Sequence, residues 1–106
     1  MVKRGDVWLV VLDPTVGSEI QKTRPCVVVS PPEIHNFQRT AIVAPMTTAA
    51  HPAPYRVPLA FARKRGLVLL DQLRTVDKAR LVSRLGAVSP QTLKRVSAVL
   101  VELFTL

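Results

Sequence analysis

The polar segment Gly17–Pro25 combines the side chains that chemistry on a phosphate group requires. It carries the carboxylate of Glu19, the ammonium of Lys22 and the guanidinium of Arg24. Because proline restricts the residue before it to extended backbone, Pro25 limits the directions in which Arg24 can point. The segment therefore predicts a site that faces a phosphate group, although a solvated ion pair between Arg24 and Glu19 would explain the same charges.

Two hydroxyl side chains, Thr47 and Thr48, follow an apolar run that ends at Pro45. Hydroxyls at the end of a strand can donate hydrogen bonds to phosphate oxygens, but they also serve in ordinary turns. The pair is a candidate anion contact only in combination with other groups.

Gln72 and Arg74 alternate with apolar residues and should share one face of a strand. Such a face can bind bases or phosphates, or it can be the solvent face of an edge strand. The charge run 63–65 precedes Gly66 and is typical of a solvated turn.

Metal and nucleophile chemistry have little support in the sequence. Cys26 is the single cysteine, and His35 and His51 lie in predicted loops without a partner at motif spacing. No metal site can be assembled from these residues, and we expect no cofactor.

Short strands must position these groups. Apolar runs rich in β-branched residues, separated by proline and polar turns, predict strands at 7–12, 25–29, 40–44, 55–59, 67–73 and 80–85. The polar stretch 13–24 is predicted to be a loop long enough to be functional.

One helix is predicted, over residues 90–103. Ser89 is a good N-cap, Pro90 suits the first helical position, and apolar residues then recur at helical spacing: Leu93, Val96, Leu100 and Leu103. The fold class is therefore mainly β with a C-terminal helix, arranged as a small barrel or strongly curved sheet.

A chain of 106 residues, 48% of them hydrophobic, predicts a single domain spanning 1–106. It is too short for a large dehydrogenase, a kinase or an α/β barrel. No apolar run reaches the ~20 residues of a membrane-spanning helix, and the N-terminal residues lack the apolar core of a signal peptide. We expect a cytoplasmic protein without a membrane partner.

The formal charge of +8 is unevenly distributed. Residues 1–53 carry five basic and four acidic side chains, whereas residues 54–106 carry ten basic and three acidic ones. Most of the cations are arginines, whose planar donors suit phosphate oxygens. The charge predicts a polyanionic partner such as a nucleic acid, and an acidic protein fits the same field.

Five separated motifs, in order, cover almost the whole chain and resemble those of the MazF/PemK family of toxin endoribonucleases. They are Lys-Arg-Gly-Asp-Val-Trp (3–8), Asp-Pro-Thr-Val-Gly-Ser-Glu (13–19), Lys-Thr-Arg-Pro (22–25), Val-Ala-Pro-Met-Thr-Thr (43–48) and Leu-Leu-Asp-Gln-Leu-Arg-Thr-Val-Asp-Lys (69–78). The resemblance continues through Leu-Gly-Ala-Val-Ser-Pro-Gln-Thr-Leu (85–93), which leads into the predicted helix.

The resemblance implies an SH3-like small barrel, a homodimer and sequence-selective, metal-independent cleavage of single-stranded RNA by a type II toxin. It also implies catalytic roles for Arg24 and Thr47, and a role for Glu19 in some members. The residues at positions where the family lines its RNA groove are Ser18, Lys22, Thr48, Gln72 and Arg74.

The implied reaction suits these residue types, because attack by a ribose 2′-hydroxyl needs only proton transfers and charge stabilisation and yields 2′,3′-cyclic phosphate and 5′-hydroxyl ends. Arg24 can bind the phosphate and donate to the leaving oxygen. It is a poor proton acceptor, so Glu19 is the alternative base. The implied partner is an antitoxin with a disordered, acidic and apolar tail.

Two other functions fit a chain of this type. One is a CcdB-like toxin that shares the barrel but acts by binding a topoisomerase without catalysis. In such a toxin we would expect the functional residues to lie on the C-terminal helix. Residues 101–106 of this chain lack the aromatic ending of that class. The other is an SH3-like binding module with no activity.

Overall fold

The computed structural model describes all residues, 1–106, and is built mainly from strands. The strands are β1 (Asp6–Val11), β2 (Thr23–Val28), β3 (Thr40–Thr47), β4 (Arg56–Phe61), β5 (Lys64–Leu69), β6 (Arg74–Asp77) and β7 (Leu81–Ala87). The helices are α1 (Pro32–His35) and α2 (Pro90–Leu103), and two 3-10 turns are η1 (Leu70–Gln72) and η2 (Lys78–Arg80). The predicted fold class, mainly β with a C-terminal helix, is confirmed.

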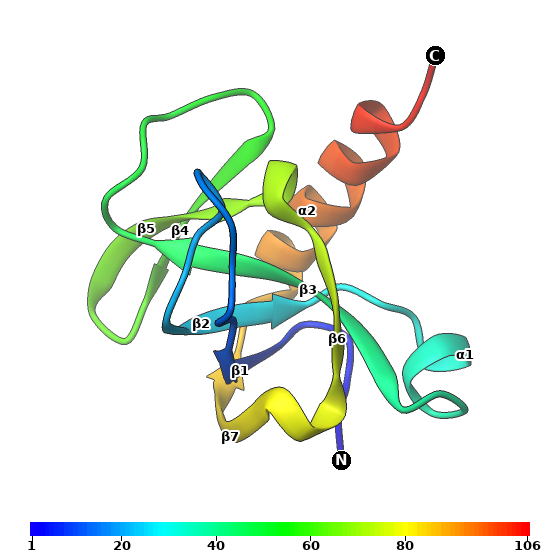
Figure 1. The fold of residues 1–106 in the computed structure, drawn as a ribbon. Helices are drawn as coiled ribbons and strands as arrows, with labels where there is room; N and C mark the ends of the chain where they lie inside the picture. Colours follow the sequence, from blue (N-terminus) through cyan, green and yellow to red (C-terminus); the bar gives the residue numbers. More distant parts are fainter.

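The strands form a curved antiparallel sheet in the order β4-β5-β3-β2-β1-β7, with β6 paired to β3. The long strand β3 changes partners along its length. It pairs with β6 and β2 over its first six residues and with β5 at Met46 and Thr47. This change of partner bends the sheet into a half-barrel, and α2 lies along one side of it (Figure 1).

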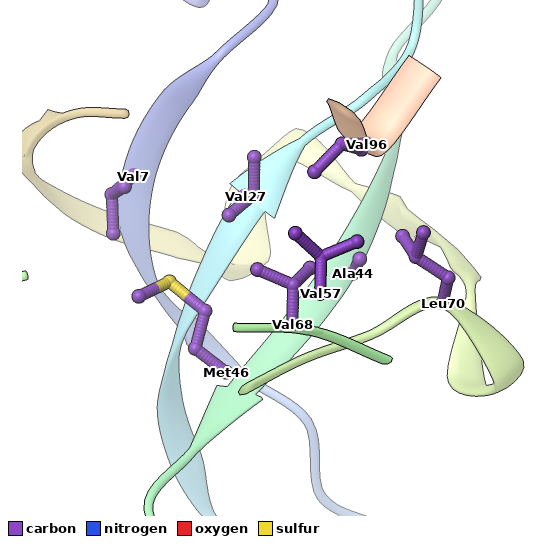
Figure 2. Packing of buried hydrophobic residues seen from close by; sticks show 8 residues of the cluster. All are labelled: Val7, Val27, Ala44, Met46, Val57, Val68, Leu70 and Val96. Carbon is purple, nitrogen blue, oxygen red and sulfur yellow. The ribbon is translucent and has the colours of Figure 1, made fainter. Parts of the chain in front are cut away.

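Two buried clusters lie on opposite faces of the central strands, because side chains along a strand alternate between faces. The first cluster includes Val7, Val27 and Val96, which comes from α2 (Figure 2). The second includes Val10 and Cys26, and loop residues such as Ile20 pack against it. The helix therefore covers one face of the sheet, while the long β1–β2 loop contributes to the other.

The predicted helix 90–103 is confirmed to the residue. The hydroxyl of Ser89 accepts a hydrogen bond from the backbone N–H of Thr92, and Pro90 occupies the start of the helix, where no N–H is needed. Loss of such a cap costs about 1 kcal/mol. No helix of the structure is both long and apolar enough to cross a membrane.

The predicted strand 67–73 is wrong beyond Leu69. The chain turns through η1 and then forms β6, a strand that the sequence reading missed. The reason is long-range pairing, because β6 hydrogen-bonds to β3 in a register that joins Ile42 to Thr75 and Val43 to Arg74. Nothing in the local apolar pattern signals this change of partner.

Other boundaries shift for the same reason. The predicted loop 13–24 ends early, since Thr23 and Arg24 already pair with Val11 and Val10. The charge run 63–65 is only partly a turn. Ala62 and Arg63 form the turn, both with positive φ, whereas Lys64 and Arg65 belong to β5.

Candidate active site

Arg24 and Thr47 lie on the neighbouring strands β2 and β3. The pairing of these strands ends at Cys26 and Pro45, and Arg24 and Thr47 are each two residues beyond that pair, which places them on the same face. Both side chains line one pocket with a volume of about 360 Å³. Two predicted groups that are far apart in sequence are therefore adjacent.

Local contacts hold both side chains. The Nε of half-buried Arg24 donates to the carbonyl oxygen of Gln21 at 3.0 Å, which leaves its terminal NH₂ groups free of hydrogen bonds within the chain. The hydroxyl of Thr47 accepts from the backbone N–H of Ala49 at 3.2 Å. Because a hydroxyl can accept and donate at once, its proton is still available to a ligand.

Gly66 determines how closely β5 approaches Thr47. A Cβ atom at position 66 would lie 2.8 Å from the carbonyl oxygen of Thr47, closer than such contacts allow. Only glycine permits this approach without moving the backbone. Gly66 therefore positions Thr47 even though it carries no functional group.

The pocket around these two residues, here called the Arg24 pocket, is rich in cations. Arg24, Lys64 and Arg65 all line it, and its lining contains no carboxylate. Its remaining lining residues are Pro25, Met46, Thr47, Thr48, Leu59, Phe61, Ala62, Gly66 and Leu85. Three cationic donors and two hydroxyls without a neighbouring acid suit a phosphate group.

A second pocket, here called the Glu19 pocket, has a volume of about 500 Å³ and a mixed character. Its polar lining combines carboxylates, an amide, a hydroxyl and a guanidinium. The full lining is Leu12, Pro14, Ser18, Glu19, Ile20, Pro45, Asp71, Gln72, Leu73 and Arg74. Alternating donors and acceptors of this kind suit the edge of a nucleobase better than a phosphate.

Side chains from the second half of the chain hold the β1–β2 loop beside the Glu19 pocket. Nη1 of Arg80 donates to the carbonyl oxygens of Val11 at 3.0 Å and Asp13 at 2.7 Å. Nη1 of Arg74 donates to the carbonyl oxygen of Leu12. Three consecutive carbonyl groups are thus bound by two guanidinium groups.

Gln72 holds the other end of the loop. Its Oε1 accepts from the backbone N–H of Ile20 at 2.8 Å. The expectation that Gln72 and Arg74 share the face of one strand is wrong, because Gln72 lies in η1 and Arg74 begins β6. They nevertheless line the same pocket, each with one group already bound to the loop backbone.

The predicted site residues therefore divide into two groups. Arg24, Thr47 and Thr48 line the Arg24 pocket. The Glu19 pocket is lined by four more of them, Ser18, Glu19, Gln72 and Arg74. Lys22 is exposed, has a positive φ of 72° and lines neither pocket.

Glu19 does not pair with Arg24. Its carboxylate instead accepts a hydrogen bond of 2.6 Å from the backbone N–H of Val16, and the two ion pairs of the structure are Arg56–Asp71 and Arg84–Asp6. The solvated ion pair that offered an alternative explanation of the charges is absent, so the guanidinium of Arg24 has no carboxylate to neutralise it.

Sequence reasoning missed Phe61 and Arg80, and it interpreted Lys64 and Arg65 only as part of a turn. The charge run was the one available signal for the two hairpin cations. No local sequence signal indicated the role of Arg80, because its hydrogen-bond partner Val11 lies 69 residues away.

Cys26 and His35 are not reactive groups of either pocket. Burial raises the pKa of the Cys26 thiol to about 12, although Arg74 and Arg24 oppose the shift. Burial, reinforced by Lys78, lowers the pKa of His35, whose ring lies 3.1 Å from the Ser30 hydroxyl. Both residues are buried in the interior of the fold.

The sequence matches a family of known proteins along nearly its whole length. A family model described as PemK-like, MazF-like toxin of type II toxin–antitoxin system matches residues 3–104. Endoribonuclease PemK of Escherichia coli is 42% identical, over 87% of this chain and 73% of PemK. Endoribonuclease EndoA of Bacillus subtilis (strain 168) is 34% identical, over 94% of this chain and 91% of EndoA.

The fold matches solved structures of the same kind. MazF of Deinococcus radiodurans superimposes with a TM-score of 0.86 and 25% identity, covering 99% of this chain and 97% of that protein. A mycobacterial endoribonuclease in complex with its cognate antitoxin gives a TM-score of 0.81 at 22% identity, covering 96% and 93%. These likenesses confirm the MazF-like half-barrel with its C-terminal helix.

Proposed function

The chain belongs to the family of PemK-like, MazF-like toxins of type II toxin–antitoxin systems, and on that premise we propose that it cleaves single-stranded RNA at selected sequences without a metal ion. It is an endoribonuclease, as its relatives PemK and EndoA are named. The observation that carries the proposal is that Arg24 and Thr47 line one cationic pocket whose lining contains no carboxylate.

The scissile phosphate occupies the Arg24 pocket in this proposal. The ribose 2′-oxygen attacks the adjacent phosphorus, and the bond from phosphorus to the 5′-oxygen of the next nucleotide breaks. The free terminal donors of Arg24 bind a non-bridging oxygen, and the Thr47 hydroxyl donates to the same phosphate. The products carry a 2′,3′-cyclic phosphate and a 5′-hydroxyl group.

Two proton transfers complete the reaction. Arg24 protonates the leaving 5′-oxygen, whose alkoxide is a stronger base than the guanidine, and recovers its proton from water. Glu19 accepts the proton of the 2′-hydroxyl. Glu19 then releases this proton to water, so that both residues return to their starting protonation states.

The Glu19 pocket selects the RNA sequence in this proposal. Ser18, Gln72 and Arg74 present a hydroxyl, an amide and a guanidinium to a base edge. Thr48 contacts RNA beside the scissile phosphate, and Lys22 contacts it from the exposed loop. Because the loop is held by a few specific hydrogen bonds, substitutions of Ser18, Gln72 or Arg74 should alter base preference before they alter the rate of cleavage.

We further propose that residues 1–106 act as one toxin domain in the cytoplasm, as a homodimer neutralised by a cognate antitoxin. A mycobacterial relative and a Deinococcus radiodurans relative have been solved with their antitoxins. The charge excess of residues 54–106 supports an antitoxin with a disordered, acidic and apolar tail, which would compete with RNA for the same positive surface.

The decisive experiment is incubation of the purified protein with a long single-stranded RNA in excess EDTA, followed by mapping of the fragment ends. We expect discrete cuts with cyclic phosphate and 5′-hydroxyl ends, and none from an Arg24→Ala preparation purified in the same way. Folded wild-type protein, free of antitoxin, that cuts no RNA in any sequence context would refute the proposal.

A further inference from the structure

We propose that the tip of the β4–β5 hairpin, residues 61–65, is an RNA subsite that binds the nucleotide next to the scissile phosphate. Lys64 and Arg65 would bind its phosphate, and Phe61 would stack on its base. The inference rests on the proposed function, and it assigns a role to a charge run that the sequence reading treated as a turn.

The hairpin tip is held directly against the Arg24–Thr47 pair. Strand β5 pairs with the end of β3 at Met46 and Thr47, and Gly66 lies against the Thr47 carbonyl. Thr47 is opposite Leu67, and Arg65 is two residues away on the same strand. Because side chains two apart share a face, Arg65 projects on the same side as Thr47. Lys64 and its cross-strand partner Phe61 project from the other face, and all three line the Arg24 pocket at the end of the hairpin.

The positive charge of the hairpin tip is not neutralised by any acidic side chain of the protein. Lys64 and Arg65 are exposed and take part in neither of the two ion pairs of the structure. Both line the Arg24 pocket, which contains no carboxylate to neutralise them. Adjacent cations without partners beside a phosphate site are available to bind the next phosphate of a polyanion.

Phe61 supplies a rigid apolar surface at the same place. It is half-buried, it pairs with Lys64 across the hairpin, and it lines the Arg24 pocket. A Cβ atom at Gly86 would lie 3.1 Å from the Cζ of Phe61, so the ring rests against the backbone of β7. An aromatic ring held in this way suits stacking with a base of any identity.

The test compares two double variants with the same change in charge. Lys64→Ala/Arg65→Ala removes the hairpin cations, and Lys94→Ala/Arg95→Ala removes two exposed cations of adjacent sequence on α2. Affinity for a single-stranded RNA with 2′-O-methyl groups, which cannot be cleaved, is measured over a range of salt concentrations. All four residues are exposed, so neither double variant should fail to fold.

We expect the hairpin variant to bind RNA about ten-fold or more weakly at low salt. The slope of log affinity against log salt should fall by about 1.4, since each lost contact to a single strand contributes about 0.7. The α2 variant should keep the wild-type slope. Equal slopes in the two variants would overturn the inference.

Phe61→Leu tests the stacking part, because leucine keeps an apolar side chain beneath Gly86 but has no ring. We expect a further loss of affinity of about ten-fold with little change in the salt slope. Unchanged affinity would remove Phe61 from the subsite. If the wild-type protein cleaves RNA but neither the hairpin variant nor Phe61→Leu shows the expected loss of binding, the subsite is wrong and the proposed function stands. If the wild-type protein cleaves no RNA, the proposed function fails whatever these binding data show.

Discussion

The Arg24 pocket and the Glu19 pocket lie along the same strand, with Thr47 of β3 in one and Pro45 in the other, yet their chemistry differs. The Arg24 pocket has three cations and no carboxylate, whereas the Glu19 pocket combines two carboxylates with one guanidinium. A phosphate fits the first and a base edge fits the second. In the proposed function the first pocket binds the scissile phosphate, and the second selects the RNA sequence while its Glu19 serves as the base.

The two pockets are also held differently. The Arg24 pocket is built at the ends of β2, β3 and β5, where sheet register sets the positions of the side chains. The Glu19 pocket depends on a loop fixed by side chain to backbone hydrogen bonds from Gln72, Arg74 and Arg80. The first should therefore tolerate little change in geometry, and the second should be easily retuned.

The largest contrast is expected between the two arginines. Arg24→Ala should lower kcat by about 10³-fold, because it removes both charge stabilisation and the proton donor of the leaving oxygen. Arg74→Ala should mainly raise KM. Single-turnover cleavage of one RNA by both variants measures this contrast, and equal losses of kcat would contradict a division of labour.

Glu19→Gln tests whether the base resides in the neighbouring pocket. If Glu19 accepts the 2′-hydroxyl proton, kcat should fall by about 10²-fold while the cleavage sequences stay the same. A variant that keeps the wild-type kcat but cuts at different sequences would instead make Glu19 a recognition residue. The measurement is single-turnover cleavage together with end mapping.

Gly66→Ala tests the close approach of β5 to Thr47. The added methyl group would push the Thr47 backbone by a few tenths of an ångström or more, and displacements near 1 Å can cost 10²-fold in rate. We expect kcat to fall about ten-fold or more while the cleavage sequence is unchanged. Thermal unfolding of the same variant provides the control for loss of the fold.

Arg80→Ala should affect only the Glu19 pocket. Loss of its hydrogen bonds to Val11 and Asp13 should lower the free energy of unfolding by about 1.5–3 kcal/mol and relax sequence preference by freeing the loop. Arg80→Lys should recover part of both, since one ammonium can still reach a carbonyl group. If a folded Arg80→Ala variant kept the wild-type RNA sequence preference, the loop would not need the Arg80 hydrogen bonds to hold its position.

The smallest effect is expected at Cys26, which is fully buried in the second cluster. Burial raises the pKa of its thiol to about 12, so the thiol stays protonated near neutral pH. Alkylating reagents should leave the folded protein unmodified and fully active. Rapid modification detected by mass spectrometry would mean that the second core cluster opens in solution.

The sequence by itself determined those features that depend on neighbouring residues. Ser89 and Pro90 start the helix because a cap and a missing N–H act within one turn, and the bounds 90–103 were predicted in full. Most strands were predicted approximately, and Arg24 does lie in extended backbone before Pro25. Residue types and spacing singled out most of the candidate site residues, and the resemblance of separated motifs then implied their roles.

Only the tertiary structure decided which of those residues meet. Arg24 and Thr47 come together through the register of β2 and β3, and Arg80 reaches Val11 across 69 positions. The turn at η1 and strand β6 form because residues 74–77 pair with β3. This pairing cannot be predicted from the local apolar pattern. Local propensity acts over a few residues, whereas a pocket depends on strand pairing between distant segments, so its composition follows from the folded chain alone.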